Sequence, residues 1–444
     1  MSFVSIAYLL FLPIVFVLYW WRPRWQNATL LAASLFFYGY WDVRFLLLMV
    51  LTALINYAVC LLPDGRRARW TAVGINMGIL ALFKYYDFFA SELSWPMLHL
   101  VLPVGISFYT FQLTAYVIDV QRRHIEAERD PLRFLTFVCF FPQLVAGPIE
   151  RAADLLPQIR SRRTFDYALA VSGMRLILWG LMKKMLLADN CATVADNVFA
   201  ASAGCTATTA DLWLGALCFT AQIYGDFSGY SDIAVGSARL FGIRLTRNFN
   251  LPYLSTTLPE FWRRWHVTLM SWLRDYIYIP LGGSRRGRMR GLANTLLVFL
   301  ASGVWHGAAW TFMAWGVWHA VCFIPFRLAG APVRRASRLV SSAVTLLVVI
   351  VGWVIFRADS LGAAAHYIAG MMTPADAMLT TTVSRLPLVW ITLFAGAEAL
   401  GGNCPVDAIG RLRSPLLRLA AYYLLFMLTL ALGGLKENFI YFQF

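Results

Sequence analysis

Histidine side chains occur within strongly apolar stretches of this sequence, where an ionisable group is costly to place. His306 belongs to Ser302-Gly-Val-Trp305-His306-Gly and lies fifteen residues beyond Gly291. On a helix that rises 1.5 Å per residue, this spacing places the imidazole roughly 22 Å into an apolar layer about 30 Å thick. Because imidazole accepts and returns protons near neutral pH, His306 is a candidate general base. The alternative is a histidine that only hydrogen-bonds between helices.

A second histidine, His266, ends the run Pro259-Glu-Phe-Trp262-Arg263-Arg264-Trp265-His266, and the segment continues to Tyr278. On one continuous helix, four side chains would share a stripe: Arg263, His266, Met270 and Arg274. Trp262 and Trp265 would belong to a broad aromatic face beside that stripe. The pattern predicts an amphipathic helix at a membrane interface. It would be either an anchor with snorkelling arginines or a cationic wall at a cavity mouth, suited to an anionic donor such as a phosphorylated coenzyme.

Further polar and aromatic residues extend the candidate site. His319 follows His306 by thirteen residues, so on one helix it would point about 140° away. The two imidazoles can converge on one site only if the chain turns between them. Asp226 and Ser228 lie in the run from Tyr224 to Asp232 and could line a polar cavity or cap a helix.

The composition defines the class of protein. The chain has 444 residues, of which 59% are hydrophobic and only 14% charged, whereas a soluble protein carries about 25% charged residues. A soluble enzyme, a disordered regulator and a small disulfide-stapled domain are excluded. The 38 basic and 23 acidic residues give a net charge of +15. The arginines cluster between apolar runs, which indicates membrane topology and not nucleic-acid binding.

The apolar segments predict an all-α polytopic membrane protein that forms a single domain over residues 1–444. About eleven or twelve spans are expected, near 1–21, 27–41, 44–62, 70–90, 99–120, 168–188, 207–225, 292–311, 313–328, 339–357, 386–400 and 416–434. Arginine clusters at 22–24, 66–69, 122–133 and 285–290 fall on one side if the N-terminus is outside. The expected outside loop 189–211 carries three aspartates and no basic residue.

Two local features lead to further expectations. Residues 134–148 are apolar but lie between arginine clusters, and Pro142, Gly147 and Pro148 interrupt them. They predict either a re-entrant hairpin lining an internal cavity or a helix lying flat on the surface. Cys191 and Cys205 share the expected outside loop and could form a disulfide in an oxidising compartment.

The motifs resemble the membrane-bound O-acyltransferase (MBOAT) superfamily, and within it the bacterial branch that acetylates exopolysaccharides such as alginate. The resemblance covers nearly the whole chain and rests on several runs: Asp226-Phe-Ser-Gly-Tyr-Ser-Asp232, Glu260-Phe-Trp-Arg-Arg-Trp-His266, Trp272-Leu-Arg-Asp-Tyr-Ile-Tyr-Ile-Pro-Leu-Gly-Gly283, Trp305-His-Gly-Ala-Ala-Trp310 and Phe356-Arg-Ala-Asp359. The sequence departs from the family at Ala320, where many relatives have glycine.

The resemblance implies a ring of transmembrane helices, with re-entrant or interfacial helices, around a central tunnel in the bacterial inner membrane. His306 matches the invariant catalytic histidine of the family and His266 a second polar position. The expected tunnel-lining residues are Asp226, Ser228, Trp262, Arg263, Trp265, Arg274, Trp305, Trp310 and His319. The resemblance also implies acetyl-coenzyme A as the donor with no bound cofactor or metal, a periplasmic acetyltransferase of SGNH type as the partner, and a polysaccharide as the final acceptor.

Two other functions fit a buried histidine beside a tunnel. A proton-coupled transporter or flippase would move an acyl or glycan intermediate unchanged, whereas a transferase must break a thioester. Transporters often show inverted repeats, and none is evident in this sequence. A structural subunit, in which the histidines only hold helices together, would lose stability and activity in parallel when His306 is changed.

Overall fold

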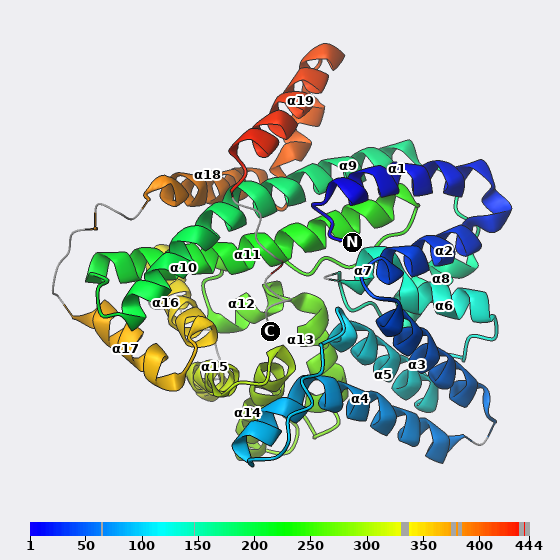
Figure 1. Cartoon of the computed structure of the whole chain (residues 1–444), viewed down its shortest axis with the longest axis horizontal. Helices are drawn as coiled ribbons and strands as arrows, with labels where there is room; N and C mark the ends of the chain where they lie inside the picture. Colours follow the sequence, from blue (N-terminus) through cyan, green and yellow to red (C-terminus); the bar gives the residue numbers. More distant parts are fainter. Residues whose placement is uncertain are drawn as a thin grey trace. The chain divides into compact units, whose positions relative to one another are not determined.

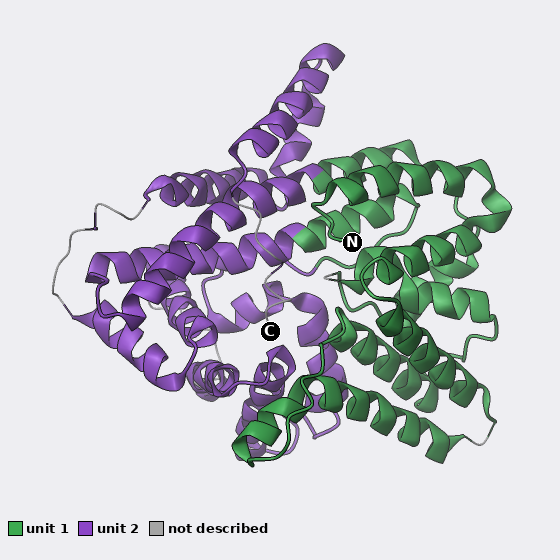
Figure 2. Ribbon diagram, in the orientation of Figure 1, with its two compact units in different colours: residues 1–177, 230–247 green, residues 178–229, 248–444 purple. Residues whose placement is uncertain are grey.

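The computed structural model describes residues 1–63, 65–145, 147–329, 337–373, 379–380, 384–434 and 439. These residues form helices and connecting loops, and no strand occurs among them (Figure 1). They group into two compact units, residues 1–177 with 230–247 and residues 178–229 with 248–444 (Figure 2). The chain therefore passes between the units three times: within helices α9 (Tyr167–Met182) and α11 (Thr209–Leu240), and again after Arg247.

The first unit contains the N-terminal helices. Besides the start of α9 and the end of α11, it comprises α1 (Ile6–Trp21), η1 (Pro23–Trp25), α2 (Gln26–Gly39), α3 (Val43–Leu61), α4 (Arg66–Glu92), α5 (Ile106–Gln121), α6 (Pro131–Cys139), α7 (Phe141–Leu144) and α8 (Ala152–Arg160).

The second unit carries the histidines. It comprises η2 (Lys183–Ala188), α10 (Asp189–Ala203), most of α11, η3 (Pro252–Leu254), α12 (Leu258–Arg264), α13 (Val267–Leu273), η4 (Arg274–Tyr278), α14 (Arg288–His306), α15 (Trp310–Ala329), α16 (Arg338–Arg357), α17 (Leu361–Met372), α18 (Leu386–Gly401), η5 (Pro405–Arg411) and α19 (Pro415–Leu432).

The apolar segments expected from the sequence all lie largely on helices, so the all-α membrane fold is confirmed. Of the described helices, α3, α16 and α19 are long and apolar enough to cross a membrane, and α1 with the segment Pro23–Gly39, bent by 110°, could form a fourth span. The expected span 292–311 is interrupted, because its helix ends before Gly307, whose backbone is extended.

Two expectations about the segment after α9 were wrong. Residues 189–203 form helix α10 and are not a loop, and Asp189 is buried. Cys191 and Cys205 do not pair, because Cys191 is buried beside Cys218 whereas Cys205 is exposed near His366, and both thiols are free. A helix places its apolar side inward, and this separates the two cysteines.

The segment 134–148 forms two short helices, α6 and α7, that break at Phe140. Nearly every described side chain from Phe134 to Glu150 is buried. This burial disagrees with a helix lying flat on a surface, which would leave one face exposed. It agrees with irregular backbone enclosed by protein, while a re-entrant path through the membrane stays a prediction.

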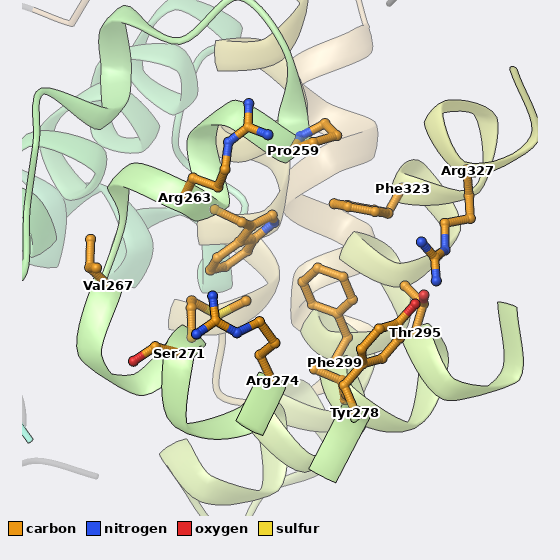
Figure 3. Close-up of a pocket in the computed structure, with 13 residues that line it drawn as sticks. Pro259, Arg263, Val267, Ser271, Arg274, Tyr278, Thr295, Phe299, Phe323 and Arg327 are labelled. Atoms are coloured by element: carbon orange, nitrogen blue, oxygen red, sulfur yellow. The ribbon is translucent and has the colours of Figure 1, made fainter. Parts of the chain in front are cut away.

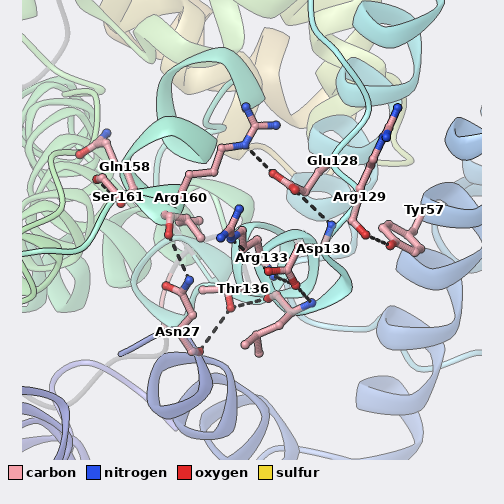
Figure 4. A network of polar contacts seen from close by, with 12 residues as sticks. Asn27, Tyr57, Glu128, Arg129, Asp130, Arg133, Thr136, Gln158, Arg160 and Ser161 are labelled. Atoms are coloured by element: carbon pink, nitrogen blue, oxygen red, sulfur yellow. Dashed lines mark hydrogen bonds and ion pairs between the residues drawn. The ribbon is translucent and has the colours of Figure 1, made fainter. Parts of the chain in front are cut away.

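A polar network fixes the loops around α6 in the first unit (Figure 4). Arg160 Nε donates to Glu128 Oε2 at 2.6 Å, and the Asp130 carboxylate caps α6 by accepting the Leu132 N–H at 2.9 Å. Burial alone would raise the pKa of Glu128, but the hydrogen bonds from Arg160 and the Asp130 N–H, together with the charges of Arg160 and Arg133, lower that pKa below its usual value. Asn27 on α2 donates to the Ile159 carbonyl at 3.0 Å, which ties α2 to α8.

Helices α9 and α11 approach closely through glycines. A Cβ on Gly173 would lie 2.6 Å from the Gly236 carbonyl, and a Cβ on Gly229 would lie 2.7 Å from the Gly180 carbonyl. Small residues that permit backbone contact are the usual means of packing helices in membranes.

Candidate active site

His306 is the last residue of α14, and its side chain is only 5% exposed. Its ring lies 5.0 Å from Trp305, 5.2 Å from Trp315 and 5.3 Å from Phe356. The helix ends here because the backbone of Gly307 is extended. A Cβ on Gly307 would lie 2.2 Å from the Phe312 ring, so the glycine leaves room for this ring. The space beside Gly307 is therefore filled by the next helix.

The chain turns after Gly307 and brings His319 to the same group of rings as His306. This turn is the condition under which the two imidazoles could converge. Trp315 on α15 stands between the two imidazoles, 5.2 Å from His306 and 5.1 Å from His319. His319 is completely buried, and neither of its ring nitrogens hydrogen-bonds to another described residue. Close packing holds it there, since a Cβ on Gly352 of α16 would lie 2.6 Å from His319 Nε2.

His266 does not lie on the single helix that the stripe requires. It adopts left-handed backbone (φ 45°) between α12 and α13. The backbone of Asn248 and Asn250 takes the hydrogen bonds at this break: Asn250 N–H donates to the Arg264 carbonyl at 3.0 Å, and Val267 N–H donates to the Asn248 carbonyl at 2.9 Å. The imidazole therefore turns inward and is 1% exposed.

The inward turn places His266 beside the other histidines through Trp305. Its ring lies 5.7 Å from Trp305 and 4.7 Å from Phe227. His266, Trp305, His306, Trp315 and His319 consequently form a continuous chain of ring contacts, which we call the histidine cluster. A tryptophan ring lies between each imidazole and the next, so each buried imidazole can take up and return a proton at its own position, away from bulk water.

The other members of the predicted stripe line a pocket of about 330 Å³, the arginine pocket (Figure 3). Its polar lining comprises Arg263, Ser271, Arg274, Tyr278, Thr295 and Arg327, and its apolar lining includes Trp262, Met270, Phe299 and Phe323. Arg327 lies 5.3 Å from the Tyr278 ring. Arg274 pairs with Asp275 at 2.7 Å. Three guanidinium groups in one pocket favour an anionic ligand.

Trp262 links the arginine pocket to the histidine cluster. It lines the pocket, and its ring lies 4.8 Å from His319 and 5.6 Å from Trp315. Thr257 caps the short helix α12 that carries it by accepting the Glu260 N–H at 3.3 Å. Burial alone would raise the pKa of Glu260, but hydrogen bonds from Thr256 and the charge of Arg264 lower it.

The remaining predicted site residues lie elsewhere. Asp226 is paired with the buried Lys184 Nζ at 3.0 Å, and Lys184 also pairs with Asp189 at 2.7 Å. Ser228 is buried two residues nearer the end of α11. Trp265 packs 4.9 Å from Trp353, and Trp310, at the start of α15, is 52% exposed. The structure does not bring these four into the histidine cluster.

Sequence reasoning missed Trp315 and Arg327 as site residues. Trp315 lies four residues before His319, so their sharing of one helix face was a readable signal. Arg327 gave no comparable signal, because only the packing of α15 against α14 places it in the pocket. Among the described residues, no group of three or more His, Cys, Asp or Glu side chains could hold a metal ion.

Comparisons with known proteins show the family of this chain. Residues 121–358, a little more than half of the chain, match the model of the membrane-bound O-acyltransferase family. The chain is 40% identical to the "Probable alginate O-acetylase AlgI" of Pseudomonas putida, over 86% of this chain and 82% of that protein. The protein of the same name from Azotobacter vinelandii is also 40% identical (85% and 79%), and the peptidoglycan O-acetyltransferase of Helicobacter pylori is 35% identical (79% and 74%). The chain belongs to the membrane-bound O-acyltransferase family and is an O-acyltransferase of the membrane.

Proposed function

We propose that this protein takes an acetyl group from a cytoplasmic thioester and passes it through a tunnel to a periplasmic acceptor, for O-acetylation of an alginate-like exopolysaccharide. The names of the relatives, which acetylate alginate or peptidoglycan, support a cell-envelope glycan as the final acceptor. The arginine clusters favour the bacterial inner membrane with the N-terminus in the periplasm. The observation that carries the proposal is the buried histidine cluster, one tryptophan away from a pocket with three arginines.

The donor in this proposal is acetyl-coenzyme A. Its phosphates would meet the guanidinium groups of Arg263, Arg274 and Arg327, which suit phosphate oxygens better than a lysine would. A pocket of about 330 Å³ is too small for a whole coenzyme, so it would hold one part of the donor, on the side of Trp262 away from His319.

The chemistry follows from His306 as the base. A hydroxyl oxygen of the acceptor attacks the thioester carbonyl carbon while an imidazole nitrogen of His306 takes its proton. The tetrahedral intermediate then collapses, the carbon–sulfur bond breaks, and the proton on His306 passes to the leaving thiolate. Indole N–H groups such as that of Trp305 would stabilise the oxyanion, and His266 would orient or polarise the carbonyl.

The acceptor in this proposal is a hydroxyl of a periplasmic partner of the SGNH-hydrolase type, which hands the acetyl group to the polysaccharide. The test uses purified protein in liposomes with acetyl-labelled coenzyme A, with and without that partner. Three chains are compared: wild type, His306→Ala, and His366→Ala as a control on an exposed histidine.

We expect wild type and the control to cleave the thioester and label the acceptor, and His306→Ala to lose at least a hundredfold in rate while staying folded. Full turnover by His306→Ala would remove it as the essential base. Label that crosses the membrane on an intact thioester would show a transporter instead.

A further inference from the structure

A second cavity lies in the first unit, between the start of α9 and the end of α11. Its volume is about 480 Å³, and its lining comprises Asp166, Ala168, Leu169, Ser172, Arg239, Arg244 and Leu245. We call it the α9–α11 pocket. None of these residues belongs to the histidine cluster or the arginine pocket, so the acyl-transfer chemistry leaves this cavity without a role.

The polar lining of the α9–α11 pocket favours an anion. Arg239 and Arg244 supply two positive charges against the single carboxylate of Asp166. That carboxylate is already engaged in capping α9, because it accepts the Leu169 N–H at 3.0 Å. Arg239 Nη1 donates to Ser172 Oγ at 3.3 Å, which places a hydroxyl beside the guanidinium. Arginine and hydroxyl together are typical ligands of a phosphate group.

The second arginine stands on a fixed loop. Arg244 N–H donates to Gln158 Oε1 at 2.8 Å, and its carbonyl accepts from Gln158 Nε2 at 3.0 Å. The amide of one side chain on α8 thus holds the Arg244 backbone on both sides, while the guanidinium remains exposed. Because the backbone is already ordered, a ligand would have to immobilise only the arginine side chain.

The surroundings of the pocket are those of a membrane interface. Phe165 and Tyr167, next to Asp166, are 50% and 75% exposed, and the Phe165 ring packs 5.4 Å from Trp20. Two residues after Ser172 on α9, Met174 is 56% exposed. Exposed aromatic and aliphatic side chains beside arginines are what a phospholipid meets where its headgroup joins its acyl chains.

We propose that the α9–α11 pocket binds the phosphate of an anionic phospholipid. Arg239 and Arg244 hold the phosphate oxygens, Ser172 supports Arg239, and the acyl chains follow the apolar surface of α9. This inference is independent of the proposed acetyl transfer.

The test measures binding of phosphatidylglycerol to the full chain in detergent, by native mass spectrometry and by the shift in melting temperature. Phosphatidylcholine serves as the zwitterionic lipid and inorganic phosphate as the soluble anion. The double variant Arg239→Gln/Arg244→Gln is compared with Arg411→Gln/Arg413→Gln, which removes the same charge from exposed positions before α19. Arg244→Gln alone keeps the test valid if the double variant misfolds.

We expect wild type and the Arg411/Arg413 variant to bind phosphatidylglycerol equally. The Arg239/Arg244 variant should bind it about tenfold more weakly, and Arg244→Gln about fivefold more weakly. Equal binding of phosphatidylglycerol by all variants, or equal binding of phosphatidylcholine and phosphatidylglycerol by wild type, would overturn the proposal. Displacement of the lipid by millimolar inorganic phosphate would overturn the lipid as the ligand and indicate a soluble phosphate.

Discussion

The indole ring of Trp262 lies 4.8 Å from the imidazole of His319, nearly perpendicular to it at 89°, and the same indole lines the arginine pocket. Phe299 also lines the pocket, and its ring lies 6.3 Å from His319. Two aromatic side chains therefore stand between the pocket and the histidine cluster. In the proposed acetyl transfer, an acyl group that moves from this pocket towards His306 would pass Trp262, so the size of residue 262 would select among acyl groups.

Replacing Trp262 with alanine should widen the path. We expect Trp262→Ala to raise turnover of butyryl-coenzyme A relative to acetyl-coenzyme A by about tenfold, because added methylenes gain space in an enlarged pocket. The ratio is measured with both labelled donors in liposomes. Since Trp→Ala in a core costs about 3–5 kcal/mol, Trp262→Phe is the milder companion. An unchanged ratio in both folded variants would show that the acyl group takes another path.

Gly352 is expected to control the position of His319. Gly352→Ala would put a methyl 2.6 Å from His319 Nε2, and such overpacking costs about 1–3 kcal/mol. Both the melting temperature and the rate of acetyl transfer should fall. Gly396→Ala on α18 is the control, since nothing lies within 4 Å of its added Cβ. A Gly352→Ala protein with unaltered stability and rate would contradict the packing described.

Lys184 should be essential for stability because it is 1% exposed and pairs with two buried carboxylates. Lys184→Met removes the buried ammonium group that pairs with Asp189 and Asp226, which should cost about 3–5 kcal/mol. The triple change Lys184→Met/Asp189→Asn/Asp226→Asn removes all three charges and should recover much of the loss. Thermal unfolding in detergent compares the two. If the triple variant is no more stable than Lys184→Met, the ion pairs are not the source of the effect.

Glu150 predicts a pH dependence. Burial raises its pKa to about 7, against hydrogen bonds from the Thr246 N–H and hydroxyl that lower it. Because the pKa of Glu150 is higher in the folded than in the unfolded protein, ionising this carboxyl costs folding free energy. The protein therefore loses stability as the pH rises from about 4.3, the usual pKa of a glutamate, towards 7. Above pH 7 the loss is complete. Glu150→Gln mimics the protonated form. It should therefore melt several degrees higher than wild type at pH 8 and at the same temperature at pH 4. Equal melting temperatures at pH 8 would contradict the shift.

The all-helical fold class and most helix positions could be predicted from the sequence, because long apolar segments and arginine clusters are local features of the chain. For His306 and His319 the sequence indicated only the condition for convergence, a turn between them, and the structure shows that turn at Gly307. The inward turn of His266 could not be predicted, because residues 248 and 250 replace the helical hydrogen bonds at the break. The pairing of Asp226 with Lys184 could not be predicted either, because Lys184 lies on another segment of the chain.

The hairpin of α14 and α15 has a consequence for how the protein is made. His306, Trp315 and His319 meet within fourteen residues, so their contacts close only a short loop and can form as soon as both helices emerge from the ribosome. His266 must wait for a contact with Trp305, thirty-nine residues later. In newly inserted chains, the contacts among His306, Trp315 and His319 should thus form first. The histidine cluster should be complete only when α13 packs against these residues and His266 reaches Trp305.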